Sequence, residues 1–468
     1  MTAIAIIDPT TEEQIGETAD GGPQAVNEAV SRARETFLSG VWHGKTPSER
    51  ARILWRVADL IEQHVDELAS IDSRNVGVSR AQARNVVLAG AEMIRYYSGW
   101  CTKIQGMAAD LKMAGGITGE SANLHAYTLK EPVGVAAAII PWNGPVYNAI
   151  AKFAPALTAG CSLVLKPAEE TPLSAVVLER LLKEAGVPDG VANFINGYGH
   201  TTGAALAAHP DVDKIAFTGS TEVGKLIVQA AAASNLKKVM LELGGKSPVL
   251  IFKDADMSRA IAGAALGIFI NSGQGCVCGS RVYVQRPVYE QVVEGIARAA
   301  KALRLGGPNE NADIGPLISR KQLDRVTGFL DEGRRDGVEI ITGGRRLDRR
   351  GYFVEPTVLT RVRPEMRLFR EEIFGPVVAV VPFDEEDEVV ASANNSIYGL
   401  AAAVWTNDLS RSHRLAKRLQ AGTVWLNAQF AWDPAMPFGG YKQSGWGHEY
   451  GWEGVNAYLS TKSVYTGI

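Results

Sequence analysis

The sequence predicts an α/β protein with more than one domain, and three observations support this class. The chain has 468 residues, more than one hydrophobic core usually serves. Between residues 136 and 233, short apolar strands alternate with helical segments, which is typical of a parallel sheet covered by helices. A second α/β pattern follows the paired glycines Gly244 and Gly245, and we place a domain boundary there.

The periodicity of the apolar residues predicts the elements in order. The first hundred residues are expected to be mostly helical, because apolar residues recur at helical spacing after Pro23 and again after Pro47. Strands are expected at 125–130 and 133–140, and the second is nearly all apolar, as in a strand buried on both faces. The repeat that follows comprises strands 136–140, 162–166, 192–195 and 214–217 and helices 146–157, 173–185, 201–208 and 222–233. The second pattern comprises helices 257–270, 289–302 and 321–333 and strands 282–285 and 377–382.

Composition and charge argue against several classes of function. A formal net charge of -3 gives no electrostatic basis for binding nucleic acid or an anionic membrane. A basic cluster lies among glycines and is interpreted as a solvated turn; it comprises Arg345, Arg346, Arg349 and Arg350. No secretory signal is recognised before Asp8, and the longest apolar run, residues 260–270, is too short to span a bilayer.

The cysteines indicate a reducing compartment. Four cysteines in so long a chain do not make a disulfide framework, so a cytoplasmic location is expected. Cys276 and Cys278 are close together but lack a second Cys/His pair nearby. No metal site is therefore predicted.

Three predicted strands end in residues that carry chemistry, and ligands of open parallel sheets bind beyond the carboxyl ends of the strands. Residues 141–145 form a rigid turn that presents the amide of Asn143, and residues 166–172 place a cation and carboxylates at a helix entrance. Residues 218–224 form a glycine-bounded turn that suits a pyrophosphate, because backbone N–H groups and the helix dipole face the anion. Its glycines match neither the dinucleotide fingerprint nor a P-loop. Taken singly, each turn is better explained as a tight strand-to-helix connection.

Two further residue types need an explanation. Glu242 is a lone carboxylate in an apolar strand, where such groups are rare unless they are satisfied or used. Cys276 and Cys278 lie in the glycine-rich segment 271–281, where a backbone N–H can approach whatever the sulfur attacks. Most free cysteines, however, are small buried apolar residues. This stretch alone leaves a catalytic and a structural interpretation open.

As a set, these residues resemble motifs of the aldehyde dehydrogenase superfamily, in family order and over essentially the whole chain. The motifs are Pro141-Trp142-Asn143, Lys166-Pro167-Ala168-Glu169, Phe217 to Gly224, Leu241 to Lys246, Gly273-Gln274-Gly275-Cys276, Glu371 to Pro376 and Pro437 to Lys442. The resemblance implies two doubly wound parallel-sheet domains, cofactor-binding and catalytic, plus a small β oligomerisation element. It implies an NAD-binding domain at 1–120 and 140–244, a catalytic domain at 245–445, and oligomerisation strands at 121–139 and 455–468.

The resemblance also implies a mechanism, in which an aldehyde is oxidised to the carboxylic acid through a thiohemiacetal and a thioester. Cys276 would be the nucleophile, and the Asn143 amide with the Cys276 N–H would hold the oxyanion. Glu242 would act as the general base that hydrolyses the thioester, and Lys152 would support the proton path. Cys101, Cys161 and Cys278 keep a structural interpretation.

The implied cofactor is NAD. Lys166 and Glu169 resemble the pair that holds the adenosine ribose, and a carboxylate at Glu169 would repel a 2′-phosphate, which disfavours NADP. The other implied cofactor contacts are Trp142 along the channel, Gly219, Ser220 and Gly224 at the pyrophosphate, and Glu372 and Phe374 at the nicotinamide ribose.

Departures from the family pattern suggest the kind of aldehyde. Gly144 and Gly275 stand where bulkier side chains are usual, and no Arg or Lys falls among the pocket positions. The implied pocket residues are Gly144, Tyr147, Asn148, Ile270, Gly275, Val277, Trp432 and Phe438. We therefore expect a bulky hydrophobic or aromatic aldehyde and disfavour one that bears a carboxylate.

The resemblance further implies a homodimer or homotetramer, with no nucleic-acid or membrane partner. His448 replaces an arginine that is usual in its motif, which puts a structural contact in doubt. Two alternatives remain at this stage: a CoA-acylating aldehyde dehydrogenase and a catalytically silent scaffold. Glu242 disfavours the first, and the presence of the nucleophile, base and amide disfavours the second.

Overall fold

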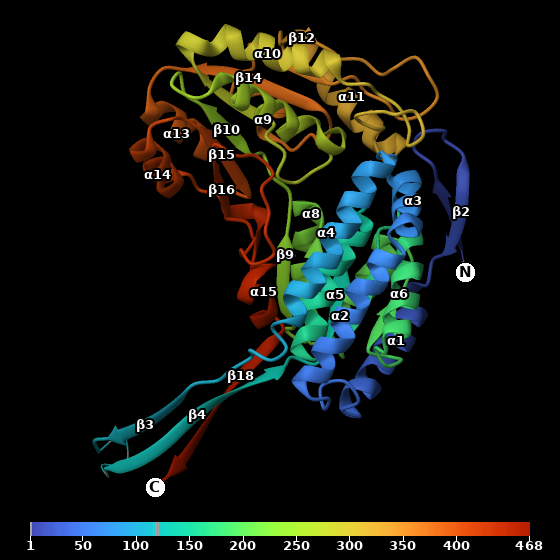
Figure 1. The fold of residues 1–468 in the computed structure, drawn as a ribbon, viewed down its shortest axis with the longest axis vertical. Coiled ribbons are helices and arrows are strands. Elements are labelled where there is room, and N and C mark those ends of the chain that lie inside the picture. Colours follow the sequence, from blue (N-terminus) through green and yellow to red (C-terminus); the bar gives the residue numbers. More distant parts are fainter. Residues whose placement is uncertain (1, 116, 118, 120) are drawn as a thin grey trace.

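The protein is built on two large, mostly parallel sheets and an antiparallel arm, as seen in a computed structural model that describes residues 2–115, 117, 119 and 121–468. The seven-stranded sheet lies at one end of the molecule, the six-stranded sheet in the middle and the arm at the other end (Figure 1). The predicted α/β class, with two parallel-sheet units, is confirmed.

The six-stranded sheet has the order β17-β9-β8-β5-β6-β7, and only the β17–β9 pair is antiparallel. Its strands are β5 (Val135–Ile139), β6 (Ser162–Lys166), β7 (Ala192–Phe194), β8 (Lys214–Thr218), β9 (Lys238–Glu242) and β17 (Gly445–Trp446). All residues of β5 and β6 are buried, since helices cover both faces of the sheet. The strands predicted at 162–166 and 214–217 match β6 and β8 to within a residue.

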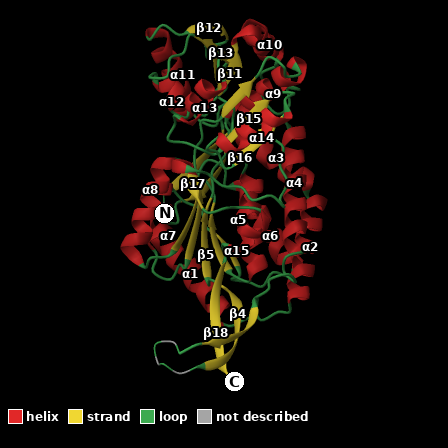
Figure 2. Cartoon of the chain, turned by 90° about the vertical axis from the view of Figure 1, so that its left-hand side faces the viewer, coloured by secondary structure: helices red, strands yellow, loops and turns green. Residues whose placement is uncertain are grey.

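Helices flank both faces of this sheet (Figure 2). One face packs against α1 (Gly22–Leu38), α7 (Ala204–Ala208) and α8 (Thr221–Ser234). The other packs against α2 (Pro47–Gln63), α3 (Val65–Val76), α4 (Arg80–Ser98), α5 (Pro145–Ala159) and α6 (Leu173–Ala185). The segment predicted as a helix at 201–208 begins as a π-helical turn at Gly199–Gly203.

The seven-stranded sheet has the order β12-β13-β14-β11-β10-β15-β16, and only the β12–β13 pair is antiparallel. Its strands are β10 (Pro248–Ile251), β11 (Arg281–Gln285), β12 (Glu339–Thr342), β13 (Thr357–Thr360), β14 (Val377–Phe383), β15 (Ala401–Trp405) and β16 (Thr423–Leu426). The helices of this region are α9 (Met257–Phe269), α10 (Tyr289–Ala302), α11 (Arg320–Arg335), α12 (Arg367–Arg370), α13 (Glu386–Asn394) and α14 (Leu409–Arg418). The chain passes from one sheet to the other between β9 and β10, at residues 243–247.

The arm comprises β3 (Ala108–Met113), β4 (Ala122–Pro132) and β18 (Leu459–Gly467), all antiparallel. The sequence assigned 121–139 to such an element, but β5 belongs to the six-stranded sheet and β3 joins the arm. The burial pattern gives the reason: β4 alternates between half-buried and exposed residues, whereas β5 is buried throughout. Before β18 the chain forms the short helix α15 (Gly451–Asn456).

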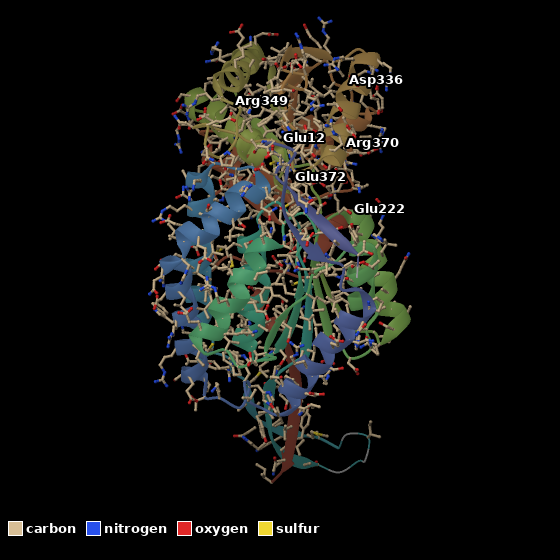
Figure 3. All side chains as sticks on the ribbon, turned by 90° about the vertical axis from the view of Figure 1, so that its right-hand side faces the viewer. Glu12, Glu222, Asp336, Arg349, Arg370 and Glu372 are labelled. Atoms are coloured by element: carbon tan, nitrogen blue, oxygen red, sulfur yellow. The ribbon has the colours of Figure 1, made fainter. Side chains whose placement is uncertain are left out.

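An N-terminal hairpin was not predicted. Strands β1 (Ala3–Ile7) and β2 (Gln14–Ala19) pair in a region expected to be helical. The turn between them reaches the residues around the seven-stranded sheet, where the Tyr352 N–H donates to Pro9 O (3.0 Å). Its Glu12 lies where the two parts of the molecule meet (Figure 3).

Glu12 is the centre of an ionic contact between these parts. Its carboxylate accepts from Arg320 Nη2 (2.9 Å), Arg346 Nη2 (3.4 Å) and the Gly351 N–H (3.0 Å). Burial acts to raise the pKa of Glu12, but the Gly351 N–H and Arg320 outweigh it and hold this pKa below its ordinary value. Arg346 of the predicted solvated turn is thus partly exposed and also ion-paired.

Within the described residues, no helix is both long and apolar enough to cross a membrane.

We predict that Glu12→Gln lowers the melting temperature by a few degrees, because it removes a charge-assisted contact of about 1 kcal/mol. A depressed folded-state pKa contributes stability above the unfolded pKa of about 4.3, and this contribution is lost as pH falls through the folded value. The difference from wild type should therefore be present at pH 7 and disappear as pH falls below the depressed folded pKa. Glu17→Gln, at an exposed residue of the same hairpin that forms no ion pair in the described chain, is the control in thermal melts.

Candidate active site

The predicted catalytic residues meet where the carboxyl ends of the six-stranded sheet face segment 271–281. Asn143 follows β5 and donates through Nδ2 to the Gln274 carbonyl (3.0 Å). Glu242 ends β9, and a Cβ added to Gly245 would collide with the Cys276 carbonyl. The two sheets therefore contribute opposite walls of one site.

The loop that carries Cys276 is tightly anchored. After α9, Asn271 and Ser272 adopt left-handed conformations (φ 51° and 55°). The Ser272 hydroxyl donates to Gly315 O (2.6 Å). The buried Gln274 side chain accepts from the Ile318 N–H (2.9 Å) and donates to Pro316 O (3.3 Å). Residues 315–318 thus hold the loop from one side, an anchoring role of Gln274 that its place in a motif did not reveal.

Cys276 differs from the other cysteines in exposure. It is partly exposed, whereas Cys101, Cys161 and Cys278 are buried. The surroundings of its sulfur raise its pKa well above the ordinary value, through desolvation first and then through the carboxylates of Glu372 and Glu242. The thiol is therefore protonated at rest and needs a proton acceptor to react.

Glu242 has the properties of such an acceptor. It is 3% exposed, and neither carboxylate oxygen has a hydrogen-bond partner among the described residues. Burial raises its pKa well above the ordinary value, the nearby Glu449 adds to this, and Lys152 opposes it. A carboxylate with a raised pKa is a stronger proton acceptor than an ordinary one.

Lys152 and Glu449 form a buried ion pair beside Glu242. Lys152 is 1% and Glu449 6% exposed, and Lys152 Nζ donates to Glu449 Oε1. The sequence pointed to Lys152 but missed Glu449, although the neighbouring His448 was singled out. The structure leaves His448 exposed and buries Glu449.

The amide of Asn143 lies against the loop that carries Cys276. Its Nδ2 donates to Gln274 O, while Asn271 Nδ2 donates to both Asn143 O and Gln274 O (3.1 Å each). In the part of the chain that the structure describes, the Cys276 N–H donates to no backbone carbonyl. Two N–H donors are thus available near the thiol for a negatively charged oxygen.

The residues predicted to hold a cofactor line the neighbouring strand ends. Buried Lys166 at the end of β6 donates to Pro167 O and Gly197 O (2.7 Å each) and to Glu169 Oε2 (3.3 Å). The Gly219 N–H donates to Glu242 O (3.0 Å), and the Ser220 hydroxyl caps α8 by accepting from the Val223 N–H (3.2 Å). A cofactor phosphate would meet the N-terminus of α8 here.

Glu372 and Phe374 reach the same place from the other sheet. Glu372 Oε1 accepts from the Gly245 N–H (2.9 Å), and burial raises the pKa of Glu372 to about 7. The rings of Phe374 and Trp142 meet edge to face with centroids 5.3 Å apart. Glu372 is labelled in Figure 3 below the helices of the seven-stranded sheet.

An aromatic wall runs through the predicted substrate pocket. Trp432 and Phe438 have ring centroids 5.0 Å apart, Phe438 and Tyr450 5.8 Å, and Tyr450 and Tyr147 6.5 Å. Tyr450, which the sequence did not single out, is buried and has a positive φ of 58°.

The remaining pocket positions differ in exposure. Asn148 and Ile270 are partly exposed, whereas Val277 is 3% exposed and packs in the main hydrophobic core. A Cβ at Gly275 would lie 3.0 Å from Cys278 Sγ, and a Cβ at Gly144 would lie 3.5 Å from Asn148 Nδ2. Among the described residues, no group of three His, Cys, Asp or Glu side chains could hold a metal ion.

The site combines a thiol, a buried carboxylate and an amide between two mostly parallel sheets. This combination defines an α/β enzyme with a cysteine at its site. Comparison with known proteins makes this class specific. A family described as the aldehyde dehydrogenase family matches residues 1–464. The chain belongs to the aldehyde dehydrogenase family.

Individual relatives agree over nearly the whole chain. Aldehyde dehydrogenase family 2 member C4 of Arabidopsis thaliana is 44% identical over 460 residues, which cover 98% of this chain and 90% of that protein. Retinal dehydrogenase 2 of Mus musculus is 44% identical over 462 residues, with 98% and 88% covered. The NAD+ complex of an aldehyde dehydrogenase from Bacillus cereus has a TM-score of 0.96 at 44% identity and covers 100% of this chain and 94% of that one.

We predict that Glu372→Gln speeds alkylation of Cys276 by iodoacetamide at pH 8 several-fold. Of the charged groups that raise the pKa of this thiol, Glu372 has the largest effect. Its neutralisation should therefore favour the thiolate and move the alkylation profile to lower pH. Glu371→Gln is the matched control, because Glu371 pairs with Arg367 instead. An unchanged profile in Glu372→Gln, with labelling at Cys276 verified by mass spectrometry, would contradict the prediction.

Proposed function

We propose that this chain oxidises an aldehyde to the carboxylic acid with NAD. Family membership supports the reaction class, and the NAD+ complex of the B. cereus relative supports the cofactor. The observation that carries the proposal is the convergence on Cys276 of a carboxylate with free oxygens, Glu242, and an amide donor, Asn143.

In the first half of the reaction, Cys276 Sγ attacks the aldehyde carbon. Because the pKa of the thiol is raised, its proton has to pass to an acceptor, and Glu242 is close enough to influence that pKa. The carbonyl oxygen becomes an oxyanion that the Asn143 amide and the Cys276 N–H stabilise. One such donor contributes about 3 kcal/mol.

In the second half, the thiohemiacetal collapses to a thioester. When bound, NAD supplies the acceptor for the hydride that leaves the aldehyde carbon. After releasing the thiol proton to solvent, Glu242 takes a proton from water, whose oxygen attacks the thioester. The acid leaves, and the proton held by Glu242 returns to the Cys276 sulfur. Lys152 favours the ionised form of Glu242 and so keeps the base competent.

The residues at the strand ends fit NAD. The buried Thr218 Oγ1 has no partner among the described residues, and it precedes the turn that opens α8. Lys166 and Glu169 would hold the adenosine ribose, Ser220 and the glycines around it the pyrophosphate, and Glu372 the second ribose, with Trp142 and Phe374 packed beside it. Glu169 accepts from a 2′-OH but repels a 2′-phosphate, which favours NAD over NADP.

The roles of Cys276 and Glu242 can be tested by absorbance of NADH. Wild type should form NADH from NAD and an aldehyde, and Cys276→Ala should form none. Glu242→Gln should form at most about one NADH per site, more slowly than wild type because the thiol loses its proton acceptor, and then stall because the thioester is not hydrolysed. Full steady-state turnover in Glu242→Gln would assign deacylation to another base, and unchanged activity in Cys276→Ala would refute the nucleophile.

The aromatic wall supports a bulky hydrophobic or aromatic substrate. Trp432, Phe438 and Tyr147 present large apolar surfaces, and no Arg or Lys stands among the predicted pocket positions. The name of the mouse relative, retinal dehydrogenase 2, refers to a large apolar aldehyde.

We expect benzaldehyde-like and C8 aldehydes to have at least tenfold higher kcat/KM than a small aldehyde or one that bears a carboxylate, since each buried CH2 contributes about 0.8 kcal/mol. Phe438→Ala should reduce this ratio, and acetaldehyde is the internal control. A preference for succinic semialdehyde would contradict the proposal.

The arm supports a proposal of self-association. Its exposed apolar residues Leu111, Met113, Tyr127, Leu129 and Tyr465 would be covered in a homodimer or homotetramer. We also propose that the NAD-binding and catalytic domains divide near residue 245, and that the protein acts in the cytoplasm.

A further inference from the structure

Asn148 makes a contact that a pocket-lining residue does not need. Its Nδ2 donates to Asn143 Oδ1 (3.4 Å), and Asn143 Nδ2 in turn donates to Gln274 O (3.0 Å). The two hydrogen bonds therefore run in one direction: the Asn148 amide donates to the Asn143 amide, which donates to the backbone of the Cys276 loop.

The backbone under Asn148 is well fixed. Asn148 lies in the first turn of α5, where its own N–H donates to Gly144 O (2.9 Å). The buried carboxylate of Asp72, from α3, accepts from the Val146 N–H (3.3 Å) and so substitutes for a side-chain cap, which Gly144 cannot provide. A donor on a helix held in this way has a defined direction.

Gly144 leaves the space for this contact. Among the described residues, and apart from the chain neighbours of Gly144, the only atom within 4 Å of a Cβ at this position is Asn148 Nδ2, at 3.5 Å. A bulky side chain at residue 144 would lie against the Asn148 amide. The lack of a side chain at Gly144 therefore leaves room for the Asn148 amide to make its contact.

We infer that Asn148 is a positioning residue that orients the Asn143 amide toward the oxyanion. The inference rests on the proposed function, in which Asn143 stabilises that oxygen. Asn143 can present either Nδ2 or Oδ1 to the substrate, and only Nδ2 stabilises negative charge. In the flipped orientation, Nδ2 would face the Asn148 donor and Oδ1 would face the Gln274 carbonyl, so both hydrogen bonds would be lost.

The contact has a second effect. A donor at Oδ1 polarises the Asn143 amide and strengthens the hydrogen bonds that its Nδ2 donates. Since the oxyanion exists only in the transition state and the tetrahedral intermediate, Asn148 should act on kcat and not on binding of NAD.

The test is a double-mutant cycle on kcat for NADH formation. Asn148→Leu keeps the branched shape and removes the donor, and we expect kcat to fall about tenfold with the KM for NAD and the melting temperature unchanged. In an Asn143→Ala background the same substitution should change kcat less than twofold, because there is no amide to orient. Asn148→Asp, which places an acceptor against Oδ1, should lose at least as much as Asn148→Leu.

The outcomes separate this inference from the proposed function. A wild-type enzyme that forms no NADH from any aldehyde refutes the proposed function. An active wild type with an Asn148→Leu kcat within twofold of it, or with equal losses in both backgrounds, refutes only the role of Asn148. If Asn148→Leu does not fold, Asn148→Ser, whose hydroxyl is too short to reach Oδ1, is measured in the same cycle with the same two criteria.

Discussion

The hydrogen bond from Asn143 Nδ2 to the Gln274 carbonyl is the contact on which the site depends, because it joins the two sheets beside the reactive thiol. Asn143 follows β5 of one sheet, and Gln274 precedes β11 of the other. Further contacts fix each partner. The capped start of α5 fixes Asn143, and residues 316–318 fix Gln274. Any displacement of one sheet against the other would therefore separate the amide from Cys276. The ionic contact of Glu12 opposes the same displacement at the edge of the molecule.

The second constraint is electrostatic. Burial and two carboxylates keep Cys276 protonated at rest, and burial together with Glu449 raises the pKa of Glu242 toward that of a useful base. The free enzyme therefore has a resting thiol beside a group that can accept its proton. Lys152 limits this rise in the pKa of Glu242, because a buried carboxylate next to Glu449 would remain protonated without a nearby cation. The reactivity of the site is thus set by groups that do not touch the substrate.

Sequence motifs predicted those site residues whose positions depend on local sequence. Strand ends and glycine turns located Asn143, Lys166 and Glu242, because such positions follow from strand-helix alternation. Glu449 was missed because its burial depends on a loop that returns from the other end of the chain to meet Lys152. The N-terminal hairpin was missed for another reason: its strands have only 5 and 6 residues, and no residue of β2 is buried, so their apolar period is weak.

The two glycines that depart from the family pattern have different meanings once their surroundings are known. A Cβ at Gly275 would point at Cys278 Sγ, so the volume lost there lies on the side of a buried cysteine and not among the aromatic residues of the predicted pocket. The space at Gly144 is shared with the Asn148 amide. In the proposed substrate pocket, the width would instead be set by the rings of Trp432, Phe438 and Tyr147. The glycines allow close packing around the Cys276 thiol and the Asn143 amide, while in the proposed function the aromatic residues would select the aldehydes that enter.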